Sequence, residues 1–175
     1  MPRKPWIPAR KRRTQVYRKP NETKHFTHYW KNSTWTDGSE SEGEPLDHTA
    51  SNLFGKRGVT KGDLVYVLTV KRGLLYLCAR LEVDRVTSQE DAEQQFGEEV
   101  WPAKDHIIAS PKSGTLQRYG QHLPPATARE LRFVTSGGTV GPVLTPGGLL
   151  HRQTMRGVRE LTPTSAALLD RYLAD

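Results

Sequence analysis

The chain contains one cysteine, Cys78, in 175 residues. A single cysteine excludes an internal disulfide and any zinc site built on cysteine ligands. No run of apolar residues approaches the roughly 18 that a membrane-spanning helix needs, and no apolar segment follows the basic start as in a secretory signal. We therefore expect a protein of the cytoplasm that makes no contact with a membrane. Cys78 itself lies in a strand-like run, where we expect a buried thiol.

The sequence also lacks the short motifs of common catalytic and nucleotide-binding sites. It has no G-x-S-x-G, no H-E-x-x-H, no G-x-G-x-x-G and no phosphate-binding loop closed by Gly-Lys-Ser/Thr. The six histidines show no spacing typical of metal ligands, since His25 and His28 would point to opposite faces of a strand. We therefore expect no metal, no cofactor and no enzymatic activity.

Acidic residues are absent from the first 20 positions, which carry eight Lys or Arg, while the whole chain has a formal net charge of +7. Such a segment cannot bury enough apolar surface to offset its ordering entropy. We predict a disordered basic arm at residues 1–22 and a single domain at residues 23–175. The arm suits a nucleic acid, because each neutralised phosphate releases counterions; a solubility tail or localisation signal is the alternative. The phosphate-binding candidates are Arg10, Lys11, Arg12, Arg13, Arg18 and Lys19.

Hydrophobic periodicity predicts the secondary structure of the domain. Residues 62–70 and 74–86 read as a hairpin, with alternate residues of its second strand on one buried face. Strands are also expected at 105–110 and 129–134, and helices within 48–58, at 89–96 after Ser88, and from Pro163 onward. The Gly-rich residues 135–148 read as a loop or loose hairpin. This order predicts an α+β domain with a curved, mostly antiparallel sheet and a few short flanking helices.

Aromatic residues make up only 8% of the chain but are concentrated in HFTHYWKNSTW, residues 25–35. Read as a strand, this segment places Phe26, His28, Trp30 and Asn32 on one side. Rings that end in an amide suit a pocket in which an unstacked base is held between aromatic faces and read along its edge. The alternative is that these rings fill the core.

The segment and its neighbours resemble a known family. Tyr29-Trp30, then Asn32 and Trp35, then Ala50-Ser51-Asn52 and Gly62-Asp63 are similar in order and spacing to the EVE domain of the PUA-like superfamily. The resemblance runs from about residue 25 to residue 110 and implies a PUA-like β pseudobarrel that reads a modified base in DNA or RNA. It also implies an effector such as a nuclease, because EVE-like modules occur beside nucleases in bacterial restriction systems. The base-binding candidates are Trp30, Asn32, Trp35, His48, Ser51, Asn52 and Asp105.

Two other classes of protein stay open on the sequence. The first is a nuclease or base-modifying hydrolase that uses Asp105 and His106 as an acid/base pair. The second is a protein-interaction module that docks an effector through the Gly-rich residues 135–148 and the terminal helix.

Overall fold

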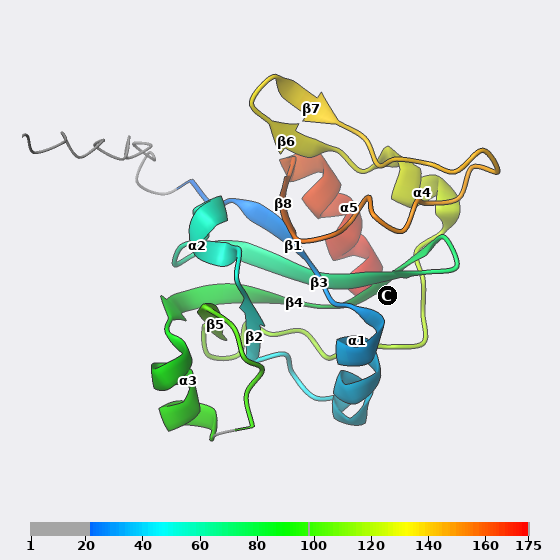
Figure 1. Ribbon diagram of the computed structural model, residues 1–175. Helices are drawn as coiled ribbons and strands as arrows, with labels where there is room; N and C mark the ends of the chain where they lie inside the picture. Colours follow the sequence, from blue (N-terminus) through cyan, green and yellow to red (C-terminus); the bar gives the residue numbers. More distant parts are fainter. Residues whose placement is uncertain (1–21, 98, 175) are drawn as a thin grey trace, which may run out of the picture.

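The computed structural model describes residues 22–97 and 99–174. The predicted basic arm, with its six phosphate-binding candidates, lies outside the described residues apart from Glu22. Eight strands form one sheet in the order β2-β5-β4-β3-β1-β8-β6-β7 (Figure 1). Every neighbouring pair is antiparallel except β1 and β3, which are parallel. The strands are β1 His25–Tyr29, β2 His48–Ser51, β3 Leu64–Lys71, β4 Leu74–Thr87, β5 Asp105–Ala109, β6 Phe133–Thr135, β7 Gly138–Val140 and β8 Val158–Leu161.

Short helices flank this sheet, so the α+β class and the mostly antiparallel sheet are confirmed. The predicted helix signals hold: the Ser88 side chain accepts a hydrogen bond from the Asp91 N–H at the start of α3, and α2 ends at Gly58 with φ of 72°. Pro163 opens α5, and Thr162 Oγ1 accepts from Ser165 N–H at 3.3 Å. The helices are α1 Asn32–Gly38, the 3-10 helix η1 Ser39–Ser41, α2 Phe54–Arg57, α3 Gln89–Phe96, α4 Pro125–Glu130 and α5 Pro163–Ala174.

Three predicted boundaries are wrong. Residues 48–51 form β2 rather than part of a helix, and residues 129–130 belong to α4, so that β6 begins only at Phe133. The strand read across residues 25–35 stops at Tyr29, and α1 begins at Asn32. The Trp35 N–H donates to Lys31 O at 2.9 Å, which closes the first helical turn. Asn, Ser and Thr favour a helix start because their short polar side chains compete with the strand ladder.

The hairpin of β3 and β4 is buried on both faces, not one. Alternation places Leu75, Leu77, Ala79, Leu81 and Val83 together, but the structure divides them between two apolar clusters. The division follows from a β-bulge, since Val67 pairs with Ala79 whereas Leu68 pairs with Leu77, leaving Cys78 as the extra residue. The predicted burial of Cys78 is confirmed, and burial raises the pKa of its thiol to about 11.

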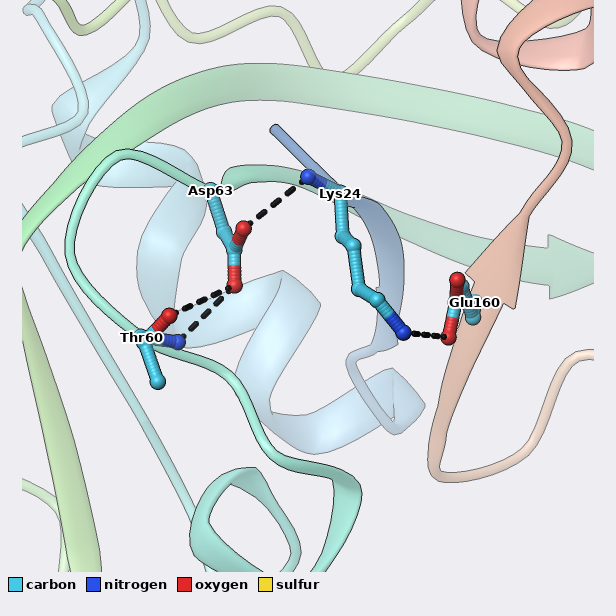
Figure 2. A network of polar contacts seen from close by, with 4 residues as sticks. All are labelled: Lys24, Thr60, Asp63 and Glu160. Carbon is cyan, nitrogen blue, oxygen red and sulfur yellow. Dashed lines mark hydrogen bonds and ion pairs between the residues drawn. The ribbon is translucent and has the colours of Figure 1, made fainter. Parts of the chain in front are cut away.

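A buried carboxylate fixes the start of β1 between its two neighbours. Asp63, in the turn before β3, accepts hydrogen bonds from Lys24 N–H at 3.0 Å and from Thr60 N–H at 2.8 Å (Figure 2). Lys24 Nζ in turn pairs with Glu160 of β8 at 3.0 Å. The sequence predicts this Gly62-Asp63 turn, and Gly62 has φ of 84°, which glycine adopts without strain. The far end of β1, so positioned, leads directly into the pocket described below.

Candidate ligand-binding pocket

A pocket of about 440 Å³ opens where β1 ends, beside the free edge of the sheet at β2. It is lined by residues 28–31 and Thr34 from the end of β1 and the first turn of α1, by residues 49–52 from β2 and its end, and by residues 101–103. The last segment belongs to residues 99–104, between α3 and β5, here called the Trp101 loop. Three stretches that are distant in sequence thus meet at one place.

Two tryptophans contribute to the pocket lining. Trp30 is 8% exposed, so most of its ring is packed in the core. Trp101 is 43% exposed, so its ring is the more accessible of the two tryptophans. The sequence predicts Trp30 as a wall but misses Trp101. The signal for Trp101 is a large aromatic residue in a polar, non-periodic stretch next to Pro102, where no core position is expected.

A hydrogen-bonded group of Trp30, Thr49 and His28 lies at the edge of the Trp30 ring. Trp30 Nε1–H donates to Thr49 Oγ1 at 3.1 Å, and His28 Nδ1 lies 3.0 Å from the same oxygen. Burial lowers the pKa of His28 to about 3, so the imidazole is neutral at pH 7. Because β1 and β2 are not neighbours in the sheet, this group joins the two strands across the pocket.

Two amide side chains hold the Trp101 loop. Asn52 Oδ1 accepts from Lys104 N–H at 2.8 Å, and Gln89 Oε1, from α3, accepts from Ala103 N–H at 2.9 Å. Ser51 Oγ accepts from Leu53 N–H at 3.2 Å, which fixes the turn after β2. The predicted residues Trp30, Ser51 and Asn52 therefore do come together, and two of their polar side chains also shape the backbone around the pocket.

The backbone of β2 adds polar groups at this edge. Asp47 O accepts from Ala109 N–H at 2.8 Å, and bonded and non-bonded pairs alternate along an antiparallel ladder. The N–H and C=O of Thr49 and Ser51 therefore face β5, whereas those of Ala50 turn toward the free edge. Ala50 lines the pocket, so its backbone donor and acceptor are available to a ligand there.

Four predicted base-binding residues do not line this pocket: Asn32, Trp35, His48 and Asp105. Trp35 is 2% exposed and packs edge-on against Tyr119, with ring centroids 5.0 Å apart, so it is a core residue rather than a stacking wall. Asn32 is exposed at the first position of α1. In the strand reading only Asn32 shares a face with Trp30, and the helix that replaces the strand after Tyr29 carries Asn32 away from the pocket.

His48 and Asp105 have partners elsewhere. His48 Nε2 lies 2.8 Å from His106 Nδ1, and burial together with the neighbouring His106 lowers the pKa of His48 to about 4. Asp105 Oδ2 accepts from Gly55 N–H at 2.9 Å. The buried His106 lies 2.8 Å from Gln89 Oε1. Since Asp105 and His106 are successive strand residues bonded to different partners, they do not form the acid/base pair of the hydrolase alternative.

Within residues 22–97 and 99–174, no group of three or more His, Cys, Asp or Glu side chains is placed to hold a metal ion. No helix in the same part of the chain is both long and apolar enough to cross a membrane. Comparisons with protein-family models, with curated proteins and with solved structures find no match to this chain. The function is therefore inferred from the pocket itself.

Proposed function

We propose that this protein is a nucleic-acid-binding module that holds one base, a modified one, in the β2 pocket. The observation that carries this proposal is that an exposed tryptophan, Trp101, lines the same pocket as Trp30 and the amide of Asn52. The pocket volume of about 440 Å³ falls within the range of roughly 300–1,000 Å³ typical of small-molecule sites. A base is flat, so it can stack on the aromatic rings, and it carries hydrogen-bonding groups along its edge that the amide can contact.

The energetics of base capture are compatible with these groups. Stacking on an aromatic side chain contributes about 1–3 kcal/mol per base, which offsets the few kcal/mol needed to unstack it. Lys31 lines the pocket, and Lys104 adjoins it through its backbone bond to Asn52. Both lysines are exposed and form no ion pair with any residue that the structure describes. Their charges would attract the flanking phosphates, and the basic arm would add affinity independent of sequence.

The finer fold assignment is also a proposal. We propose a PUA-like pseudobarrel of the EVE type, because residues 50–52 and Trp30 line the pocket and Gly62-Asp63 forms the turn before β3. A role in prokaryotic defence, with a nuclease as effector, follows from this resemblance.

The proposal is tested with Trp101→Ala in equilibrium binding to labelled oligonucleotides at fixed salt. Duplex DNA, single-stranded DNA and RNA would carry cytosine, 5-methylcytosine, 5-hydroxymethylcytosine, adenine or N6-methyladenine at one position. Loss of stacking should weaken binding of the preferred base by about 5- to 100-fold and leave the background affinity unchanged.

Two variants control this test. Trp101→Phe keeps a stacking face and should retain most of the preference. Phe96→Ala removes an exposed aromatic residue that does not line the pocket and should change nothing in the preference. Equal binding of all bases by the wild type and by Trp101→Ala would refute the proposal.

A further inference from the structure

The orientation of the Asn52 amide is determined by its neighbour. A backbone N–H can only donate, so the Asn52 atom that lies 2.8 Å from Lys104 N must be the oxygen. The side-chain NH₂ then points away from Lys104 and has no hydrogen-bond partner among the residues that the structure describes. Asn52 can therefore offer a ligand two donor hydrogens, while its oxygen already accepts one hydrogen bond and is turned toward Lys104.

The hydrogen-bonded group of Trp30, Thr49 and His28 leaves a further donor at the pocket. Trp30 Nε1–H donates to Thr49 Oγ1, and one hydrogen occupies the contact between Thr49 Oγ1 and His28 Nδ1. If the threonine hydroxyl donates to Nδ1, the hydrogen of neutral His28 is on Nε2. If Nδ1–H donates instead, the hydroxyl hydrogen of Thr49 is left over. In both arrangements one donor hydrogen stays uncommitted on a residue that lines the pocket.

Ser51 adds a third donor by the same reasoning. Its Oγ accepts from Leu53 N–H at 3.2 Å, so its own hydroxyl hydrogen is available. The side chains that line this part of the pocket thus supply mainly donors, and the Ala50 carbonyl at the free edge supplies an acceptor. A ligand edge that presents a hydrogen-bond acceptor fits such a lining. An edge that presents an N–H would place its own donor against the donor NH₂ of Asn52, and neither group would be paired.

We propose that Asn52 determines the specificity of this pocket by donating to an unprotonated ring nitrogen on the pairing edge of the bound base. This inference rests on the proposed function. Cytosine and adenine carry such a nitrogen, N3 and N1 respectively. Uracil, thymine and guanine carry an N–H at the equivalent position and are rejected. The selection acts on the base identity, independently of any methyl group that the pocket accommodates.

The decisive variant is Asn52→Asp. A carboxylate keeps an oxygen for Lys104 N–H and so preserves the Trp101 loop, but it replaces the two donors by an acceptor. Asn32→Asp is a matched control, because it introduces the same charge on an exposed residue that does not line the pocket. Binding would be measured to single-stranded oligonucleotides that differ at one position in two matched pairs, deoxycytidine against deoxyuridine and deoxyadenosine against deoxyinosine.

The wild type and Asn32→Asp should prefer deoxycytidine and deoxyadenosine by about tenfold or more, since an unpaired or opposed donor is costly in a partly desolvated site. Asn52→Asp should reduce both ratios at least threefold or reverse them. The hydrogen-exchange rate of the Lys104 amide should be unchanged in Asn52→Asp and faster in Asn52→Ala. That result would mean that Asn52→Asp changes the contact with the ligand and leaves the Trp101 loop in place.

Two results would overturn this inference. Binding that depends on Trp101 but shows ratios near one in the wild type would leave the proposed function intact and remove the role of Asn52. The same conclusion would follow if Asn52→Asp kept affinity ratios, deoxycytidine to deoxyuridine and deoxyadenosine to deoxyinosine, as large as those of the wild type. If no oligonucleotide shows binding that depends on Trp101, the proposed function fails, and the inference fails with it.

Discussion

The two free edges of the sheet differ in what holds them. At β2, the side chain of Thr49 is bonded to Trp30 and His28, His48 contacts His106, and Ser51 supports the following turn. At β7, the ladder to β6 and one bond from Thr135 Oγ1 to Gly138 O at 3.2 Å are local to one hairpin. The β2 edge is therefore organised by segments from three parts of the chain, and the β7 edge by neighbours in sequence.

This difference indicates which edge of the sheet can form a ligand-binding site. A pocket needs polar groups that are fixed before the ligand arrives, and at β2 long-range contacts fix Thr49 and His48. The β7 edge carries exposed apolar side chains, Val134 and Val140, on strands of three residues each. Substitutions at β2 should thus cost far more than substitutions at β7, and the four predictions below test that contrast in decreasing order of effect.

Acid should weaken the β2 edge first. His28 and His48 have folded-state pKa values lowered to about 3 and about 4, against roughly 6.5 when unfolded. The unfolded state therefore binds more protons below pH 6.5, so stability is fully present above that pH and falls as pH drops toward 4. Urea unfolding should show a loss of about 2 kcal/mol from each ring at pH 5 relative to pH 7. His48→Gln should flatten this dependence, and an unchanged slope in that variant would contradict the assignment.

Thr49→Val should destabilise the domain by about 2–3 kcal/mol in urea unfolding at pH 7. The variant conserves shape but leaves the buried Trp30 Nε1–H without its acceptor and His28 without its partner. Thr49→Ser keeps the hydroxyl and should recover most of the loss. A valine variant within about 0.5 kcal/mol of the wild type would show that this group does not support the edge.

Gln89→Ala should release the Trp101 loop at a smaller cost of about 1 kcal/mol. Without Gln89 Oε1, the Ala103 amide should exchange its hydrogen about three- to tenfold faster, and the Trp101 resonance of 5-fluorotryptophan-labelled protein should shift. Gln89→Glu keeps an acceptor for the Ala103 N–H, so exchange at Ala103 should stay slow, although the variant loses the hydrogen bond that the Gln89 amide donates to Glu93 at 2.7 Å. Gln94→Ala is the matched control, because Gln94 is an exposed glutamine on the same helix. If the Ala103 amide exchanged at equal rates in both alanine variants, Gln89 would not hold the Trp101 loop.

Val140→Thr at the β7 edge should change the free energy of unfolding by no more than about 0.5 kcal/mol, because the side chain is exposed and no long-range group depends on it. A loss comparable to that of Thr49→Val would mean that both edges are equally supported, and the contrast between them would disappear.

The sequence predicts those parts of the fold that follow from periodicity and local signals. The β3–β4 hairpin, the Ser88 cap, the start of α5 at Pro163 and the turn at Gly62-Asp63 are all found as expected. The β-bulge at Cys78 could not be predicted, because it depends on how β3 pairs with β4 and leaves the alternation of the sequence unchanged. Because the bulge reverses which face the later residues of β4 occupy, it divides the apolar side chains between the two clusters.

The site was predicted in part for a similar reason. Trp30, Ser51 and Asn52 lie in stretches whose composition or resemblance marks them, and they do meet in the pocket. Trp101 and Gln89 act through tertiary contacts that bring the Trp101 loop to β2, and nothing in their local sequence specifies those contacts. The position of Asn32 differs from the prediction because the period of a strand does not hold in the first turn of a helix, and that of Trp35 because its ring fills the core.

The position of β1 has a consequence for biosynthesis. This strand lies in the sheet between β3 and β8, so one of its two neighbours is made more than a hundred residues later. At about 5–20 residues per second, the ribosome needs roughly 6 to 26 seconds to make the residues between β1 and β8. Once β3 and β4 have emerged, β1 can pair with β3, but its other edge stays unpaired until β8 is made. Chaperone contact with the growing polypeptide should therefore persist until residues 158–161 are released from the exit tunnel.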